Sequence, residues 1–215
     1  GNMLKFYYNP VSVNARRVWI TLLEKQIPFE PILIRLDDDQ FSDEFTAINP
    51  LQRVPAIADG TLQVVESLAI LAYLEAKYPT PSLMPSEPET VARVRMVETI
   101  TVVELQPETL PLTRPMVGLE VDPQKLAAAQ ARVTVILQFL EQLLAPGPYF
   151  AGTDLTLADI VAGTLVPALP LENYPRLSTW ANRLTQRESW QKTAYTPDDI
   201  AAALPNIRKI LERRS

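Results

Sequence analysis

The 215-residue chain contains neither cysteine nor histidine. The absence of cysteine excludes disulfides and thiol nucleophiles, and the absence of both residues excludes metal sites built from them. Without histidine, a Ser-His-Asp triad is also excluded. A metal site made of carboxylates alone would need a ligand loop that this sequence lacks, so we expect no metal. Any catalytic proton transfer must use Tyr, Ser, Asp, Glu, Lys, Arg or the substrate itself.

Long apolar runs and an excess of positive charge are also missing. No apolar run approaches the roughly 18 residues that span a bilayer, so no membrane partner is expected. The formal net charge of −5 argues against nucleic acid as a partner. The chain is 47% hydrophobic and 21% charged, as in ordinary globular proteins. No signal peptide precedes the first strand-like segment, which predicts a cytoplasmic location.

The start of the chain alternates between the patterns of strands and helices. We predict a strand over residues 4–8, a helix over 15–25 and a second strand over 31–36. The second strand is apolar enough to be buried on both faces. A strand–helix–strand unit predicts two parallel strands with a right-handed crossover.

A hairpin and a helix complete this region after a loop. Two apolar runs, 54–58 and 61–65, flank an Asp-Gly dipeptide, which is a strong signal for a two-residue hairpin. Leucine and alanine at helical spacing predict a helix over 67–77. The resulting order, β-α-β, loop, β-β-α, is the thioredoxin-like order.

A proline-rich segment then separates this region from a helical remainder. Residues 79–88 contain four prolines, so they form a stiff linker between a domain over 3–78 and a domain over 89–215. In the second domain we predict helices over 89–105 and 123–144. The three prolines between these helices predict an irregular helix end or a loop there.

Two short motifs in the first domain predict a ligand site. Residues 49–57 read NPLQRVPAI, and Glu66-Ser67 follow at the start of the predicted helix. A cis bond before Pro55 would leave the polar backbone groups of Val54 turned outward, free to pair with an extended ligand. The start of a helix offers N–H donors and a positive dipole end to a carboxylate. Together they describe a site for a small peptide-like molecule with a free carboxylate.

A third motif lies in the helical domain. Residues 156–159 read TLAD, a capping box with Asp in place of Glu, which opens an apolar helix over 160–166. Residues 174–180 then read as the start of another helix. Taken alone, both are structural signals.

At this spacing, residues 49–57 with Glu66-Ser67 resemble the thioredoxin-like domain of the cytosolic glutathione transferases, and residues 156–159 resemble the capping box of that family's C-terminal domain. The resemblance implies an α/β thioredoxin-like N-terminal domain followed by an all-α C-terminal helical domain. It implies a detoxifying transferase that conjugates the glutathione thiolate to a small hydrophobic electrophile. It also implies a homodimer, with glutathione as co-substrate and no other cofactor.

The resemblance implies a role for each motif residue. Val54, before Pro55, would pair its backbone with the cysteinyl part of glutathione. Ser67 would hold the γ-glutamyl carboxylate, although a helix cap alone would also explain a serine there. The Glu66 carboxylate would accept a hydrogen bond from the γ-glutamyl ammonium group, or it would orient Ser67.

The glycyl end of glutathione has weaker candidates. Gln52 and Arg53 precede the turn, and Arg53 could meet the glycyl carboxylate or be solvated. Gln40 stands where a plant-like class of the family has a polar residue, but the basic residue that follows in that class is Phe41 here.

Two residues compete for activation of the thiol. Residues 9–18 read NPVSVNARRV and resemble the family's serine-type turn, with Ser12 at the serine. Its hydroxyl would donate to the thiolate, supported by the helix N-terminus and Arg16. Tyr8 ends the first strand and fits the tyrosine-type alternative. The purely structural alternative is that Ser12 only caps the N-terminus of the following helix.

Other functions remain open within the same resemblance. The chain could be a non-catalytic protein-interaction module or a glutathione peroxidase acting on organic hydroperoxides. A reductase with a catalytic cysteine is excluded by composition. The pocket for the electrophile would come from the loop after Tyr8 and from residues 105–117, and the sequence does not identify the electrophile.

Overall fold

The computed structural model describes residues 2–36, 38–144 and 147–214. The chain forms two units, one of residues 1–83 and 188–206 and the other of residues 84–187 and 207–215. Over these described ranges, no helix is both long and apolar enough to cross a membrane. Each unit is described by itself below.

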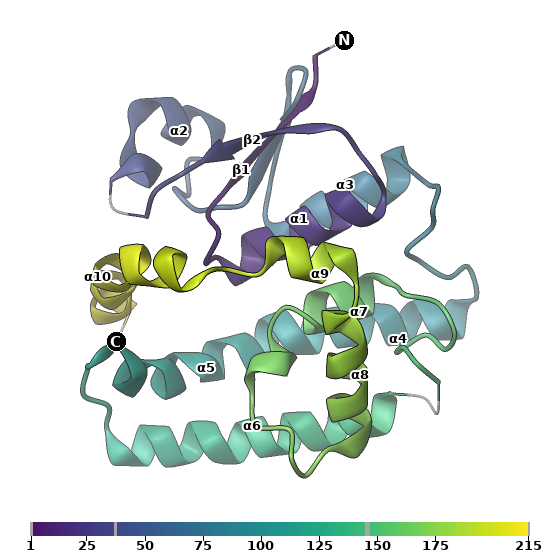
Figure 1. Ribbon diagram of the computed structural model, residues 1–215, viewed down its shortest axis with the longest axis vertical. Coiled ribbons are helices and arrows are strands. Elements are labelled where there is room, and N and C mark those ends of the chain that lie inside the picture. The colour runs from purple at the N-terminus through teal and green to yellow at the C-terminus, as the bar shows by residue number, and fades with distance from the viewer. Residues whose placement is uncertain (1, 37, 145–146, 215) are drawn as a thin grey trace. The chain divides into compact units, whose positions relative to one another are not determined.

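The first unit is built on a four-stranded sheet (Figure 1). Its strands are β1 (Leu4–Tyr8), β2 (Phe29–Leu33), β3 (Ala56–Asp59) and β4 (Leu62–Val65), in the order β2-β1-β3-β4. β1 and β2 are parallel, which confirms the predicted strand–helix–strand unit. β3 pairs antiparallel with β1 and β4, and the turn before β4 places Gly60 at φ 63, so the predicted hairpin is confirmed.

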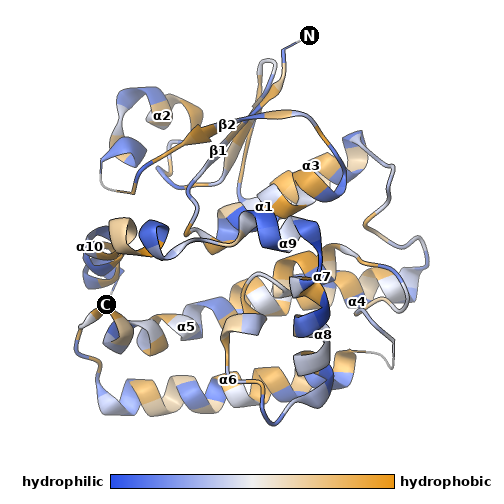
Figure 2. Cartoon of the chain, viewed as in Figure 1, coloured by the Kyte–Doolittle hydropathy of each residue, from blue (hydrophilic) through white to orange (hydrophobic). Residues whose placement is uncertain are grey.

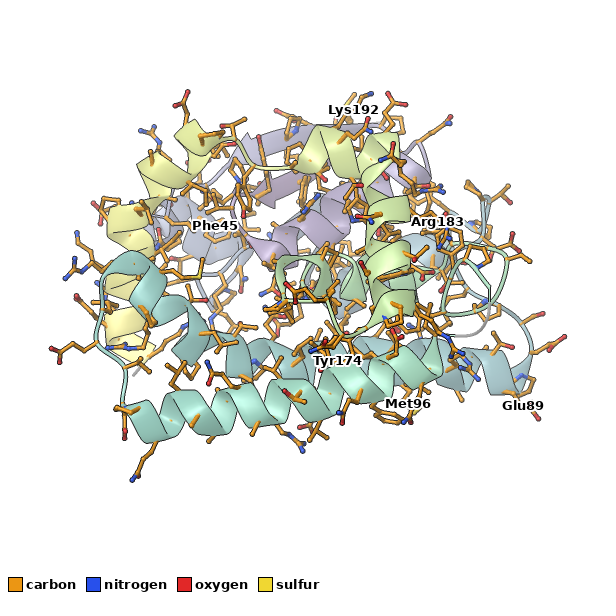
Figure 3. The ribbon with its side chains drawn as sticks, turned by 60° about the horizontal axis from the view of Figure 1, so that its bottom comes forward. Phe45, Glu89, Met96, Tyr174, Arg183 and Lys192 are labelled. Atoms are coloured by element: carbon orange, nitrogen blue, oxygen red, sulfur yellow. The ribbon has the colours of Figure 1, made fainter. Side chains whose placement is uncertain are left out.

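Two helices pack side by side on one face of the sheet, and a third lies on the other face. α1 (Val13–Glu24) and α3 (Ser67–Lys77) are the pair. Tyr8 contacts Trp19 of α1, whereas the adjacent Tyr7 contacts Phe45 of α2 (Asp43–Ile48), which is labelled in Figure 3. Successive strand residues point to opposite faces, so α1 and α2 cover different sides.

The segment before the hairpin is more regular than the predicted loop. It contains a short 3₁₀ turn, η1 (Asp39–Phe41), and then α2. Ser42 caps α2 by accepting a hydrogen bond from Phe45 N at 3.1 Å. A six-residue helix carries less than two turns of periodicity, so the sequence pattern could not reveal it.

The prediction that the second strand is buried on both faces is wrong. β2 is an edge strand of the sheet, and Glu30, Pro31 and Leu33 are exposed. Pro31 has no N–H to donate to a ladder, so it suits an edge position. The strand also begins two residues earlier than predicted and ends at Leu33.

A buried lysine closes the first unit behind α1. Lys25 donates to the carbonyls of Tyr78 at 2.6 Å and Pro81 at 2.7 Å, and it pairs with Glu75 at 2.8 Å. Because its side chain is fully buried, each of these partners is needed to offset the loss of hydration. The end of α1 is thereby tied to the end of α3 and to the proline-rich segment after it.

The second unit begins with a long helical segment that contains a wide turn. α4 (Pro88–Thr99) continues through a π-helical stretch, η2 (Ile100–Leu105), into α5 (Gln106–Thr113) and the 3₁₀ turn η3 (Arg114–Val117). The prediction that prolines make residues 107–115 irregular is wrong for α5. Pro107 lies in the first turn of α5, where its missing N–H costs nothing, and Pro111 is accommodated inside the helix.

The other helices of this unit are joined through their ends. α6 (Pro123–Leu143) supplies Glu141, which accepts from Arg176 N at 3.0 Å and Leu177 N at 2.8 Å at the start of α8 (Pro175–Thr185). α7 (Leu157–Ala162) is buried along its whole length and is hydrophobic in Figure 2, and η4 (Val166–Ala168) follows it. The predicted capping box and the predicted start of α8 are confirmed, but α7 spans 157–162 rather than the expected 160–166.

The predicted capping box is the polar centre of this unit. Asp159 has no exposed surface, and its carboxylate accepts from Phe150 N at 3.0 Å, Thr156 N at 2.9 Å and Trp180 Nε1 at 2.9 Å. Burial raises the pKa of Asp159, while these hydrogen bonds act in the opposite direction. The one side chain therefore joins α7, α8 and the segment before α7.

Two C-terminal helices follow. α9 (Glu188–Thr193) belongs to the first unit, where it packs against α1. α10 (Pro197–Arg214) starts in the first unit and ends in the second. The sequence pattern predicted no boundary for either helix.

Candidate active site

The predicted site residues leave the sheet at one end. Tyr7 pairs with Ala56, and Ala56 pairs with Val65. The turn after β1, the residues before β3 and the residues after β4 therefore meet at the same end of three adjacent strands. The register alone brings together Ser12, the Val54-Pro55 pair and the Glu66-Ser67 pair.

The turn after β1 is held by Asn9. Its side chain donates to Ile34 O at 3.0 Å and accepts from Val11 N at 3.0 Å. Ser12 is the N-cap of α1, and its hydroxyl oxygen accepts from Ala15 N at 3.1 Å. The described residues offer no acceptor to the Ser12 hydroxyl proton, so the half-buried hydroxyl can still donate to a ligand.

The two arginines of this turn are committed to the protein. Arg16 donates through Nε to Thr193 Oγ1 at 3.0 Å and through Nη2 to Trp190 O at 3.0 Å, both on α9. Arg17 is fully buried and donates to Asn14 Oδ1 at 2.8 Å. Burial lowers the pKa of Arg16, and it lowers that of Arg17 to about 10. The Arg16 charge therefore lies in the first turn of α1, with two of its donor groups turned to α9.

Tyr8 is placed by aromatic packing. Its ring stacks on Phe6 at a centroid distance of 5.3 Å and lies 5.1 Å from the ring of Trp19. Both neighbours lie on the α1 side of the sheet. This packing explains an aromatic residue at the end of β1 without any role for its hydroxyl.

The segment before β3 contains one residue, Val54, whose backbone N–H and C=O form no hydrogen bond with the described residues. The Val54–Pro55 bond is cis, as predicted. Asn49 braces the segment by donating to Arg53 O at 2.7 Å, and the Gln52 amide donates to Thr46 Oγ1 at 3.2 Å. In the part of the chain that the structure describes, neither Val54 N–H nor Val54 C=O forms a hydrogen bond. Arg53 is exposed beside it.

The start of α3 is an open helix end. Glu66, its N-cap, has φ 72 and ψ 122, a conformation that costs a non-glycine residue about 1–3 kcal/mol. Its side chain makes no cap hydrogen bond. Among the described residues, the N–H groups of Ser67, Leu68 and Ala69 have no acceptor. Three N–H donors and the positive end of the helix dipole are therefore open beside the buried Ser67, an arrangement that suits a carboxylate.

Gln40, in η1, has only part of its side-chain amide satisfied by the protein. It is buried, and its Nε2 donates to Leu36 O at 3.3 Å. Its Oε1 is also buried and finds no partner in the described residues. A buried amide oxygen without a hydrogen bond is costly, so an N–H donor brought by a ligand would stabilise it.

A pocket of about 230 Å³ adjoins the turn after β1, within the first unit. Pro10 and Val11, in the loop after Tyr8, form one side. Residues 105–117, which were also expected to line the electrophile pocket, do not line this one. Residues at the end of β2 and on α10, including Ala202 and Ala203, form the remainder. The α10 residues were missed because nothing in their sequence pattern shows that α10 returns to the first unit.

Among the described residues, no group of three or more acidic side chains is placed to hold a metal ion. The chemistry available at this end of the sheet is hydrogen-bond donation by a hydroxyl, two helix N-termini and one free backbone segment.

Comparison with known families agrees with this geometry. The model for the glutathione S-transferase N-terminal domain matches residues 6–82, and the model for the glutathione S-transferase C-terminal domain matches residues 74–188. This chain belongs to the glutathione S-transferase family. Its thioredoxin-like unit and its helical unit have the fold of that family.

Relatives with known names span most of the chain. Human glutathione S-transferase theta-1 is 34% identical over 196 residues, which cover 84% of this chain and 82% of the relative. Maleylacetoacetate isomerase of Rattus norvegicus is 33% identical over 185 residues, covering 81% and 84%. A solved glutathione S-transferase-I bound to lactoylglutathione is 28% identical, has a TM-score of 0.77 and covers 90% of this chain and 99% of its own.

Proposed function

We propose that this family member is a glutathione transferase that joins the glutathione thiolate to small, largely apolar electrophiles. The observation that carries the proposal is the open N-terminus of α3 next to the unpaired backbone of Val54. One end of the sheet thus presents an anion site and a strand-like pairing edge, which match the γ-glutamyl carboxylate and the peptide backbone of glutathione. The solved relative that holds lactoylglutathione supports this assignment.

Glutathione lies across this end of the sheet in the proposed complex. Its γ-glutamyl carboxylate accepts from Ser67 and the first N–H groups of α3, while Glu66 accepts from its ammonium group. The cysteinyl backbone pairs with Val54, whose following residue Pro55 starts the turn into β3.

The glycyl end of glutathione faces the opposite side of the site. Its carboxylate meets the exposed Arg53, and its amide N–H satisfies the buried Gln40 Oε1. Gln52 contributes less, because its Nε2 already donates to Thr46.

Ser12 activates the thiol. A free thiol titrates near pKa 8.5, and a pKa of about 6.5 requires about 2.7 kcal/mol of preference for the thiolate. The Ser12 hydroxyl proton, which has no acceptor in the described protein, donates to the sulfur. The N-terminus of α1 and the Arg16 charge in its first turn supply the remaining preference. The thiol proton passes to water. The thiolate then displaces halide from an aryl halide, or adds to the central carbon of an isothiocyanate, whose nitrogen takes a proton from water.

The electrophile occupies the 230 Å³ pocket beside Pro10 and Val11. The small residues Ala202 and Ala203 leave room for it, and the volume suits a compact substrate. Because this pocket begins at the turn that carries Ser12, the electrophilic atom can approach the sulfur from the α10 side.

The wider biological context is part of the same proposal. The protein acts in detoxification in the cytoplasm as a homodimer, with domains over residues 3–78 and 89–215. Size-exclusion chromatography with light scattering tests the dimer, and a mass equal to one chain over a wide concentration range would exclude it.

A substrate panel tests the activity. Aryl halides, isothiocyanates and organic hydroperoxides are each incubated with glutathione and the purified chain. We expect conjugation of at least one halide or isothiocyanate, and retention on immobilised glutathione. Retention without turnover on any substrate would favour an interaction module, whereas turnover of hydroperoxides alone would favour a peroxidase.

A further inference from the structure

The parallel ladder between β1 and β2 ends at Tyr8. Tyr8 pairs with Leu33, and Ile34 N donates to Tyr8 O at 2.8 Å. In a parallel ladder the next bond would run from the N–H of the residue two positions after Tyr8 to Ile34 O. That position is occupied by Pro10, which has no N–H to donate. The backbone therefore cannot hold the turn after β1 against β2.

The side chain of Asn9 supplies the donor that Pro10 lacks. Asn9 is buried, and its Nδ2 donates to Ile34 O at 3.0 Å. Its Oδ1 accepts from Val11 N at 3.0 Å, so the other end of the same amide shapes the turn. Among the described residues, no other hydrogen bond joins residues 9–12 to a neighbouring strand. One buried amide thus fixes both the shape of the turn and its position on the sheet.

The turn that Asn9 holds ends at Ser12. Ser12 N donates to Asn9 O at 3.1 Å, which closes a turn with Asn at its first position and Pro at its second, the residues favoured there. Ser12 then caps α1, where its Oγ accepts from Ala15 N. The chain of bonds from Ile34 through Asn9 to Ser12 therefore decides where the Ser12 hydroxyl lies at the end of the sheet.

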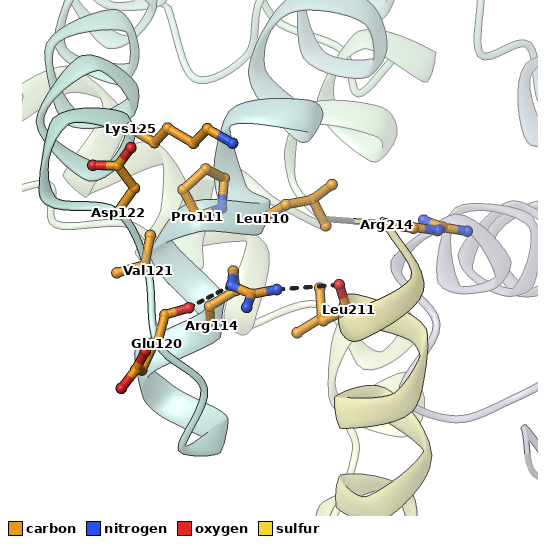
Figure 4. A pocket seen from close by; sticks show the side chains of 9 residues that line it. All are labelled: Leu110, Pro111, Arg114, Glu120, Val121, Asp122, Lys125, Leu211 and Arg214. Carbon is orange, nitrogen blue, oxygen red and sulfur yellow. Dashed lines mark hydrogen bonds between the residues drawn. The ribbon is translucent and has the colours of Figure 1, made fainter.

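A comparable side-chain bridge in the second unit has a structural role alone. Arg114 donates through Nε to Glu120 O at 2.7 Å and through Nη1 to Leu211 O at 3.2 Å, as Figure 4 shows. These bonds join the turn before α6 to the end of α10, and neither segment carries a residue that we propose to contact glutathione. Asn9 differs, because the segment that it holds carries Ser12.

We propose that Asn9 is a positioning residue for the transferase reaction, holding Ser12 where its hydroxyl can donate to the glutathione sulfur. The inference rests on the proposed function, because it requires Ser12 to stabilise the thiolate. Without the bond to Ile34, the turn of residues 9–12 can shift on the sheet, and a hydroxyl displaced from the sulfur makes a longer and weaker hydrogen bond. Both ends of the Asn9 amide are engaged by the protein, so Asn9 acts on the sulfur through Ser12.

A double-mutant cycle on Asn9 and Ser12 tests the proposal. The full chain is saturated with glutathione, and the apparent pKa of the bound thiol is read from thiolate absorbance against pH. Asn9→Ala should raise this pKa and lower turnover of an aryl halide at neutral pH about three- to tenfold, because a smaller fraction of the thiol is ionised. In the Ser12→Ala background the same substitution should raise the pKa no further, because the hydroxyl that Asn9 positions is already gone.

Two further variants separate positioning from stability. Thr21→Val removes a buried hydrogen bond of α1, from Thr21 Oγ1 to Arg17 O at 2.8 Å, so it should lower the free energy of unfolding and leave the thiol pKa unchanged. The double variant Asn9→Ala/Pro10→Ala restores a backbone N–H that can donate to Ile34 O, and it should bring the thiol pKa back toward that of the parent.

The outcomes distinguish this inference from the proposed function. If Ser12→Ala raises the thiol pKa but Asn9→Ala does not, the positioning role is overturned and the serine-type activation stands. The positioning role is also overturned if Asn9→Ala raises the pKa equally in both backgrounds, or if Asn9→Ala/Pro10→Ala shows no recovery. An unchanged pKa in Ser12→Ala would contradict the proposed thiol activation itself, and the positioning role with it.

Discussion

The sequence marks the starts of α3 and α7 with similar polar residues, but the hydrogen-bonding groups at the two helix starts differ. Those of α7 are satisfied by the protein, and those of α3 are not. At α7, Thr156 and Asp159 form a reciprocal capping box, and Asp159 also accepts from Phe150 and Trp180. At α3, Glu66 makes no cap, adopts a positive φ, and leaves the first N–H groups without acceptors in the described chain.

The difference separates an interaction that serves stability from one that serves binding. A buried helix end must satisfy its own donors, because an unmade hydrogen bond there costs about 1–3 kcal/mol. A helix end that faces a ligand is useful only if its donors stay free. The α3 end keeps both its open donors and its strained backbone, as expected if it binds glutathione in the way we propose. The four predictions below test this contrast, from the largest expected effect to the smallest.

Asp159→Ala should lower the free energy of unfolding by about 3–5 kcal/mol, because it leaves buried N–H groups of Phe150, Thr156 and Trp180 without an acceptor. Urea denaturation measures the change. Asp154→Ala, at an exposed position five residues earlier, is the matched control and should change little. A loss below about 1 kcal/mol for Asp159→Ala would mean that the closed end is not a centre of stability.

Ser67→Ala should weaken glutathione binding by about 1.5–3 kcal/mol, the value of a hydrogen bond to a charged group. The free energy of unfolding should change little, since no hydrogen bond of the Ser67 hydroxyl stabilises the described fold. Calorimetry and urea denaturation give the two readouts. Asp122→Ala, which removes the closed cap of α6, should show the reverse pattern. An unchanged glutathione affinity in Ser67→Ala would place the carboxylate elsewhere.

Ser12→Ala should lower turnover of an aryl halide at neutral pH about ten- to a hundredfold, equal to about 1.4–2.7 kcal/mol. It should also raise the apparent pKa of bound glutathione, followed by thiolate absorbance against pH. The loss of a hydrogen bond to the charged form is the physical cause.

Two further variants isolate the hydroxyl proton of Ser12. Ser12→Asp keeps a cap for α1 but has no proton to donate when ionised, so stability should recover while turnover stays low. Tyr8→Phe keeps the packed ring and removes only the hydroxyl. A large loss in Tyr8→Phe with none in Ser12→Ala would replace the serine-type assignment by the tyrosine-type one.

Glu66→Gly should change the free energy of unfolding by no more than about 1 kcal/mol, and in the stabilising direction. Glycine relieves the strain of φ 72, which outweighs its entropic cost of about 0.5–1 kcal/mol. Glutathione affinity should fall, because the carboxylate that meets the ammonium group is lost. Glu66→Ala should lose the same affinity with no gain in stability. Destabilisation of Glu66→Gly by more than about 1 kcal/mol would show that the backbone here is not strained.

Much of the fold could be predicted because its signals are local. The hairpin follows from Asp59-Gly60, and the start of α7 follows from Thr156 and Asp159. The errors arose where neighbours override local preference. The apolar pattern of β2 predicted a strand buried on both faces, but β2 lies at the edge of the sheet. Pro111 was predicted to break a helix, but it lies inside α5.

The sequence predicts part of the geometry of the candidate site, for one physical reason. Residues 49–55 come directly before β3 and residues 66–67 directly after β4, so the register of one hairpin brings them together. The commitment of Arg16 to Thr193 on α9 could not be predicted, because it joins residues 177 positions apart. The same holds for the α10 side of the pocket beside Val11.

By itself, the sequence determined which chemistry is possible in this protein. It excludes cysteine and histidine catalysis, and it supplies the turns, caps and helix starts whose conformations depend on nearest neighbours. Only the tertiary structure decided which of these polar groups are already satisfied. The Asp159 carboxylate accepts hydrogen bonds from Phe150, Thr156 and Trp180. The first N–H groups of α3 and the backbone of Val54 have no hydrogen-bond partner among the described residues. A hydrogen bond between distant segments depends on how the chain packs, so whether a motif serves stability or a ligand is set by that packing.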